Sequence, residues 1–166
     1  LEELQSSMPS CDPAGQIFLQ SMQIALEGAV AHMRRWAAAL EEAAVGNPAR
    51  ARLLRRQADM MHHLSTAPPR DFWEALQLVL SFHLMMQLDD RGAMAFGRLD
   101  QYLYPFWEAD VVSGRATREQ LQRCLDHFFA KITVDEDVQN IVVGGTNPSD
   151  ASDATNELSC QVLEAC

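Results

Sequence analysis

Basic residues are scarce in this sequence. Its 166 residues include 13 lysines and arginines against 23 aspartates and glutamates, which gives a formal net charge of −10 at pH 7. A nucleic-acid-binding surface needs a cluster of positive side chains that can neutralise phosphates. The composition therefore argues against nucleic acid as a partner, and a hydrophobic share of 48% is typical of a folded domain and not of a disordered chain.

Long hydrophobic runs are also missing. No stretch approaches the roughly 18 consecutive apolar residues that a membrane-spanning helix needs. The first ten residues, LEELQSSMPS, lack the positive region and the apolar segment of a secretory signal peptide. We therefore predict no membrane association and a cytoplasmic location.

Motifs for metal and nucleotide chemistry are absent too. The four cysteines form no C-x-x-C pair and have no histidine at metal-ligand spacing, which is typical of reduced cytosolic thiols. The sequence contains no P-loop, no G-x-S-x-G and no H-E-x-x-H motif. The stretch GGTNP lacks the glycine spacing and the lysine of a phosphate loop. We therefore predict no metal site and no directly bound cofactor.

What the sequence does contain is a series of helical patterns. Asp12-Pro13 is a strong helix start, with an acceptor at the N-cap and proline at the first position. The helix is expected to end at Gly46, where Asn47 caps a second helix that stops before Pro68. Apolar residues at spacings of three and four predict a buried stripe along the first helix: Phe18, Met22, Ala25, Ala29, Met33, Trp36 and Leu40.

The second half begins with a third helix, which Asp71 caps in an acidic capping box with Glu74. This helix is apolar almost all round, so we expect it to be buried, with His83 as a hydrogen-bonded core imidazole. A second box at Thr117–Gln120 starts another helix, and the last helix is expected to begin near Ser152 or Asp153. Residues 140–145, NIVVGG, give the only convincing strand. A single strand makes no sheet, so its partners are expected outside this sequence.

Four ordered segments carry a family resemblance: RDFWEALQLVLSFHLMMQL, GAMAFGRLDQYLYPFWEAD, GRATREQLQRCLDHFFAKI and QNIVVGGTNPSDASDATNELSCQVLEA. In this order they resemble one stretch of the glycyl radical enzymes, the pyruvate formate-lyase-like family. The resemblance implies an α/β barrel of ten strands inside a helical shell. It makes the chain an N-terminal-half fragment that is mainly helical with one or few strands: residues 12–68 belong to the shell, and residues 69–166 supply helices, a cavity turn and one barrel strand.

The resemblance also implies chemistry. In the family a glycyl radical passes to a cysteine at the barrel centre, and the resulting thiyl radical takes a hydrogen atom from a small organic substrate. The intact parent is expected to be an anaerobic carbon–carbon or carbon–heteroatom lyase. Its partners would be a radical S-adenosylmethionine activating enzyme and, in a homodimer, a second copy. The radical is its only cofactor and lies outside this chain.

Residue roles carry over only to the segment around Gly92. By resemblance GAMAFGR is the turn that faces the substrate, with Gly92 and Ala93 at the positions of the His-Ser pair that holds hydroxyls in the diol-dehydratase branch. Neither residue has a side-chain donor, which disfavours polyol dehydration and favours an apolar or aromatic substrate such as an arylacetate. Arg98 is expected to be buried and ion-paired, with Asp100 or a carboxylate of the third helix, and to hold the turn in place.

The sequence departs from the family in other places. No cysteine follows a glycine, so the Gly-Cys-x-Glu loop of the thiyl radical has no match, and the Arg-Val-x-Gly loop of the glycyl radical has none. The stretch between Arg98 and Gln139 is shorter than in the family. We therefore expect this chain alone to be inactive. The alternative is a non-catalytic helical scaffold or regulatory remnant of the same fold.

Overall fold

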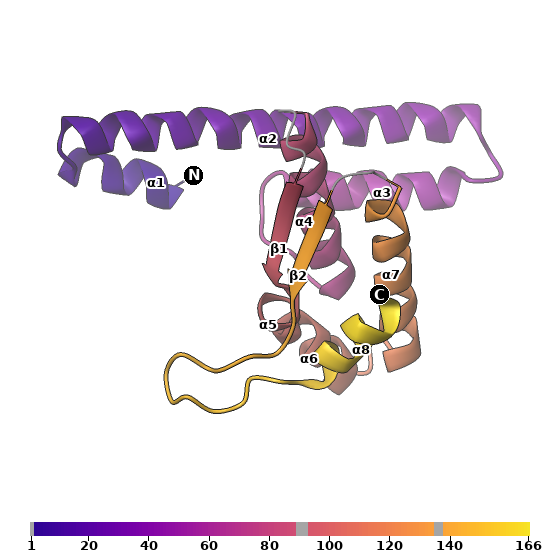
Figure 1. Cartoon of the computed structure of the whole chain (residues 1–166). Coiled ribbons are helices and arrows are strands. Elements are labelled where there is room, and N and C mark those ends of the chain that lie inside the picture. The colour runs from indigo at the N-terminus through magenta and orange to yellow at the C-terminus, as the bar shows by residue number, and fades with distance from the viewer. Residues whose placement is uncertain (1, 89–92, 135–137) are drawn as a thin grey trace. The chain divides into compact units, whose positions relative to one another are not determined.

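The computed structural model describes residues 2–88, 93–134 and 138–166 (Figure 1). The chain divides into two compact units, 1–68 and 69–166. Most described residues are helical, and two strands form a parallel sheet. The predicted class, mainly helical with few strands, is confirmed.

The first unit is built around one long helix. A short helix α1 (Glu2–Ser7) and a 3-10 turn η1 (Met8–Ser10) precede α2 (Pro13–Gly46), and α3 (Ala51–Leu64) follows it. Asp12 caps α2 by accepting a hydrogen bond from the Gly15 N–H at 2.7 Å, so the predicted start and end of this helix are confirmed. Asn47 does not cap α3: it lies at the C-terminal end of α2 and accepts the Arg50 N–H through its main-chain carbonyl, so α3 begins later than predicted.

The predicted apolar stripe of α2 is buried only in part. The buried residues are Ala29, Met33, Ala37 and Ala44, all from the middle of the helix onward, whereas Phe18 and Trp36 are 64% and 50% exposed. The reason is length: at about 1.5 Å per residue, α3 spans roughly 21 Å and cannot cover an α2 of roughly 51 Å. In the second half the alanine and methionine face packs in preference to Trp36.

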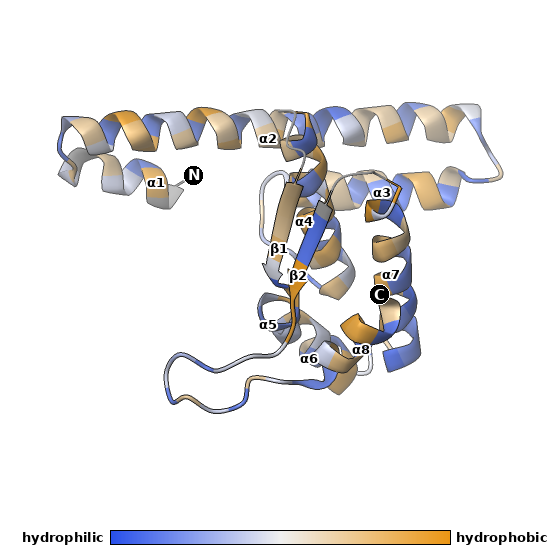
Figure 2. Ribbon diagram, viewed as in Figure 1, coloured by the Kyte–Doolittle hydropathy of each residue, from blue (hydrophilic) through white to orange (hydrophobic). Residues whose placement is uncertain are grey.

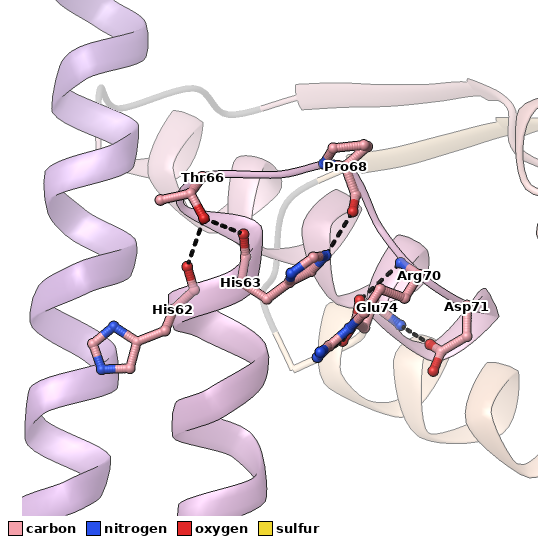
Figure 3. A network of polar contacts seen from close by, with 7 residues as sticks. All are labelled: His62, His63, Thr66, Pro68, Arg70, Asp71 and Glu74. Atoms are coloured by element: carbon pink, nitrogen blue, oxygen red, sulfur yellow. Dashed lines mark hydrogen bonds and ion pairs between the residues drawn. The ribbon is translucent and has the colours of Figure 1, made fainter.

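The end of α3 is fixed by main-chain acceptors. His63 Nε2 lies 2.8 Å from the Pro68 carbonyl, and the Thr66 hydroxyl donates to the His63 carbonyl (Figure 3). His62 turns the other way and lies 3.2 Å from Glu41 on α2. The contacts of His63 and Thr66 thus lie where the helix ends, before the two prolines, whereas that of His62 joins α3 to α2.

The second unit begins with α4 (Phe72–Gln87). Asp71 accepts the Glu74 N–H at 2.8 Å, whereas the Glu74 carboxylate reaches back to the N–H of Arg70 and not of Asp71 (Figure 3). In the predicted capping box Glu74 therefore accepts from the residue before the N-cap and not from the N-cap itself. One face of α4 is buried, but Leu84 and Met86, near the C-terminal end of the helix, are 42% and 47% exposed, so the prediction of an entirely buried helix is wrong.

The rest of the second unit forms a β-α-β arrangement. Strand β1 (Ala93–Arg98) leads into α5 (Leu99–Tyr102), α6 (Tyr104–Val112) and α7 (Arg118–Ile132), and β2 (Val138–Val142) then pairs with β1 in parallel. Thr117 and Gln120 make the predicted capping box of α7. Helix α8 (Glu157–Ala165) begins later than predicted, because Asn156 and not Ser152 forms its capping box, with Ser159.

Two sequence predictions about strands are wrong. The stretch from Ala93 to Arg98, predicted to be a turn, is a strand, and it supplies within this chain the partner that β2 was expected to find elsewhere. The core of this unit is one cluster that joins α4, β1 and the helices after it. Its members are Phe72, Ala75, Leu76, Leu80, Phe96, Leu99, Leu103, Trp107, Leu121, Leu125, Phe128, Phe129, Ile132, Leu158 and Val162.

Candidate functional site

One face of the two-stranded sheet is covered by helices. Phe96 of β1 is 7% exposed, and its ring lies edge-on to Phe128 of α7 with the centroids 5.4 Å apart. Ile141 and Val143 pack against the same core from the side of β2. This face is therefore the structural side of the sheet.

His83 belongs to the covered face. It is 1% exposed, its ring centroid lies 4.8 Å from that of Phe96, and its Nδ1 lies 3.2 Å from the Met94 sulfur. The imidazole thus packs between α4 and β1. The predicted core position of His83 is confirmed.

The other face of the sheet carries small and polar side chains. Ala93 and Ala95 point away from the helices because successive strand residues alternate between faces, and both are exposed. On β2 the same face holds Asn140 and Val142. Of the two predicted substrate-contacting residues, Ala93 thus lies on the open face, and Gly92 lies outside the described residues.

Arg98 stands at the end of β1 and binds the turn that follows β2. It is half-buried, and its guanidinium donates to the Gly144 carbonyl at 2.7 Å and to the Thr146 carbonyl at 3.2 Å. In the described part of the chain Arg98 makes no ion pair, so the expected pairing with Asp100 or a carboxylate of α4 is wrong. Two main-chain carbonyls take the place of that carboxylate.

Asp100 binds the same turn from its other side. It is fully buried, and its Oδ2 accepts the Gly144 N–H at 2.8 Å as well as the Ser159 hydroxyl. The Asp100 carbonyl accepts from the Asn156 side chain at 3.2 Å, next to the cap of α8. Arg98 and Asp100 therefore hold the carbonyl and the N–H of one residue and connect β1, the turn after β2 and the start of α8.

The backbone conformation of this turn explains why it contains two glycines. Gly144 has φ +65° and Gly145 has φ +91°, in the left-handed region that side-chain-bearing residues avoid. A Cβ on Gly144 would also lie 2.9 Å from the Thr155 hydroxyl oxygen. Glycine thus allows the close approach that brings Gly144 to Asp100.

Sequence reasoning missed three residues of this arrangement. Gln101 donates to the Ala154 carbonyl at 2.8 Å, Ser159 donates to Asp100, and Asn140 stands on the open face of the sheet. The first two act between segments far apart in the chain, for which a single sequence gives no signal. An asparagine inside the strand Val138–Val142, a position where this residue type is uncommon, was the available signal for Asn140.

Ionisable chemistry at this end of the sheet is limited. Burial raises the pKa of Tyr102 to about 12, and its hydroxyl donates to the Phe96 carbonyl at 3.1 Å, so the phenol is a neutral donor. Among the described residues no three His, Cys, Asp or Glu side chains gather closely enough to hold a metal ion. No described helix has both the length and the apolar character to cross a membrane.

The complete chain, residues 1–166, matches the family model described as pyruvate formate lyase-like. The chain belongs to the pyruvate formate-lyase-like family. A probable dehydratase, YbiW, of Escherichia coli K12 is 31% identical over 93% of this chain and 22% of its own length. The glycyl radical subunit of a 4-hydroxyphenylacetate decarboxylase of Clostridioides difficile is 30% identical over 64% of this chain and 14% of its own length.

A solved structure of the family has the same fold over nearly the complete chain. It comes from a study of 1,2-propanediol dehydration in Roseburia inulinivorans and superposes with a TM-score of 0.85 at 27% identity. The match covers 99% of this chain and 24% of that structure. The chain thus spans less than a quarter of the length of these family members.

Proposed function

We propose that the intact protein is a glycyl radical lyase acting on a small organic substrate, and that this chain supplies part of its helical shell and two neighbouring barrel strands. The observation that carries the proposal is the parallel β1–β2 pair, with helices on one face and Ala93 and Ala95 on the other. Parallel strands with crossover helices occur in sheets that are covered on both faces or closed into barrels. The match to the family over all 166 residues supports the same arrangement.

Each site residue has a role in this proposal. Gly92 and Ala93 would line the substrate cavity without donating side-chain hydrogen bonds. Arg98 and Asp100 would keep the ends of the two strands in register through Gly144, to which both are bonded. They act at the cavity as structural residues and not as catalytic ones.

The reaction would follow the radical route of the family. A glycyl radical installed by a radical S-adenosylmethionine activating enzyme would pass to a cysteine, and the thiyl radical would take a hydrogen atom from the substrate and later return it. This chain has no cysteine preceded by glycine, so the residues that carry these steps would belong to other parts of the intact protein. An anaerobic cytoplasmic homodimer is the expected working form.

An arylacetate is the substrate class that this cavity wall favours. The side chains of Ala93, Ala95 and Val142 are apolar and, except for valine, small, which leaves room for a ring and gives it a hydrocarbon surface. The relative that decarboxylates 4-hydroxyphenylacetate supports the choice. The relation to the 1,2-propanediol structure makes a diol the competing candidate.

The test uses the full-length gene product together with its activating enzyme, under anaerobic conditions. We expect electron paramagnetic resonance to detect a protein radical whose α-proton splitting disappears when the protein contains α-deuterated glycine. The activated protein is then given 4-hydroxyphenylacetate, 1,2-propanediol and glycerol, and conversion of the arylacetate is expected. The 166-residue chain is the control and should form no radical.

Two results would contradict the proposal. A full-length protein that forms no glycyl radical would support a non-catalytic scaffold instead. A radical with preferential conversion of glycerol would keep the radical enzyme but exclude the arylacetate.

A further inference from the structure

Asn140 is a polar side chain on the open face of the sheet, where the other polar residue in register, Arg98 beside Val142, is already bonded to the Gly144 and Thr146 carbonyls. Asn140 lies in the register of β2 directly beside Ala95 of β1, and Val142 follows on the same face. Figure 2 shows the contrast along β2, which is hydrophilic near its start and hydrophobic at its end. The amide thus stands between the apolar side chains of Ala95 and Val142.

This amide has no structural task within its own unit. Its side chain is exposed and makes no hydrogen bond to any residue in the described ranges, whereas its neighbour Ile141 packs against the core on the other face. Asparagine is among the residues depleted in strands, because its side chain packs poorly and competes for main-chain hydrogen bonds. An asparagine in the middle of a barrel strand therefore has a reason outside local stability.

The neighbours of Asn140 make it accessible to a ligand. Ala95, its partner across the ladder, extends only one methyl group from the sheet, and Ala93 lies two residues earlier on the same face. Between such short neighbours the asparagine amide projects farthest from the sheet. The strand is also irregular here, because β1 has a bulge between Ala95 and Gly97, next to the pairing with Asn140 and Ile141. Bulges are common beside active sites, where they redirect side chains.

We propose that Asn140 is a substrate-positioning residue that hydrogen-bonds one polar oxygen of the substrate. This inference rests on the proposed function, since it requires that the open face of β1 and β2 lines the cavity. The substrate is then a small amphiphile, with its apolar body against Ala93, Ala95 and Val142 and a hydroxyl or carboxylate at Asn140. A single amide among hydrocarbon side chains fixes the orientation of such a molecule, because any other orientation would leave the amide unpaired inside the closed cavity.

The test compares Asn140→Ala, Asn140→Asp and Asn47→Ala in the activated full-length protein. Asn47 is the matched control, since it is an exposed asparagine in the turn between α2 and α3 with no side-chain hydrogen bond to described residues. Each variant is assayed with 4-hydroxyphenylacetate and 1,2-propanediol, and radical content and Tm are measured alongside. We expect Asn140→Ala to lower kcat/KM by about ten- to a hundredfold, mainly through KM, with radical content and Tm unchanged.

The variant Asn140→Asp shows whether the substrate oxygen at Asn140 belongs to a hydroxyl or to a carboxylate. If Asn140 faces a hydroxyl, the new carboxylate still accepts a hydrogen bond and restores part of the activity lost in the alanine variant. If Asn140 faces a carboxylate, like-charge repulsion makes the aspartate variant worse than the alanine variant.

The outcomes separate this inference from the function on which it rests. Normal radical content with kcat/KM of Asn140→Ala within twofold of wild type would overturn the positioning role and leave the radical lyase intact. A parallel loss of Tm, radical and activity on both substrates would assign Asn140 a structural role instead. A wild-type protein without a radical, or one that converts neither compound, would overturn the proposed function and this inference with it.

Discussion

At the scale of single residues, the best-defined feature is Gly144, whose two main-chain groups are both held by side chains, one from the end of β1 and one from α5. Arg98 takes the carbonyl and Asp100 takes the N–H. Sequence reasoning selected both residues but expected Arg98 to pair with Asp100 or with a carboxylate of the third helix. The error has a physical cause. Opposite charges two residues apart suggest an ion pair, but the main-chain carbonyls of the turn after β2 also accept hydrogen bonds from a guanidinium, and a single sequence does not show that this turn lies beside Arg98.

The first prediction concerns Asp100. Replacing it with alanine would leave the Gly144 N–H and the Ser159 hydroxyl without their buried acceptor, so we expect Asp100→Ala to lower the free energy of unfolding by about 3 kcal/mol. Asp100→Asn keeps an acceptor oxygen and removes a buried charge that has no ion-pair partner among the described residues, so its cost should be about 1 kcal/mol or less. Urea unfolding of the 166-residue chain, followed by circular dichroism, measures both values.

Asp126→Ala is the control for this comparison. Asp126 is exposed on α7 and, among the described residues, accepts a hydrogen bond only from Gln122, four residues earlier, so its loss should change stability by no more than about 0.5 kcal/mol. Equal losses for the alanine and asparagine variants at position 100 would show that the charge, and not the acceptor, holds the turn.

At the scale of elements, the sequence predicted the helices well and the strands poorly. Asp12, Asp71 and Thr117 each cap a helix where a local signal placed them. Strand β1 was missed because its outward residues are Ala93 and Ala95, so its alternation is between large and small apolar side chains and not between apolar and polar ones. An alternation of large and small apolar residues predicts a strand only when it is already known that one face of the sheet requires small side chains.

The start of α4 shows how a cap can come from another element. The Phe72 N–H donates to the Asp110 carboxylate of α6 at 2.9 Å, and Arg115 lies 2.7 Å from the other oxygen of the same carboxylate. Asp110 is 3% exposed, whereas Asp71, the local cap predicted from sequence, is only half-buried. The cap that sequence cannot predict is thus the more buried one.

The second prediction compares these two caps. Asp110→Ala leaves a buried N–H and removes a contact between α4 and α6, so it should lower the free energy of unfolding by about 2–3 kcal/mol. Asp71→Ala removes an ordinary helix cap and should cost about 1 kcal/mol. Urea unfolding of both variants of the 166-residue chain shows which one loses more free energy of unfolding. A larger loss for Asp71→Ala would show that the local cap contributes more to stability.

At the scale of the whole molecule, local sequence patterns do not reveal which polypeptide covers a surface. The fold of the intact protein was therefore predicted from the family resemblance. The hydrophobic pattern of α4 correctly predicts a helix that is apolar on several faces, but only one of these faces packs against the described residues of its own unit. Leu84 and Leu88 of this region are 42% and 79% exposed. The chain spans less than a quarter of the length of the relatives described above, in which further polypeptide is available to cover such a surface.

The third prediction follows from that surface. Alone, the 166-residue chain should bind a hydrophobic dye such as anilinonaphthalene sulfonate and should self-associate at micromolar concentration, because exposed apolar patches drive association in water. The double variant Leu84→Lys/Leu88→Glu should reduce dye fluorescence and sedimentation-detected oligomers with little change in Tm, since neither side chain belongs to the core cluster.

Val112→Lys is the control for this surface. Val112 is 82% exposed at the end of α6, and its replacement should leave both measurements nearly unchanged. In the full-length protein the double variant Leu84→Lys/Leu88→Glu should instead lower Tm, because its charged side chains would be buried under the polypeptide that covers this face of α4. An unchanged Tm in the full-length protein would show that Leu84 and Leu88 stay in contact with water there, and would contradict the idea that further polypeptide covers them.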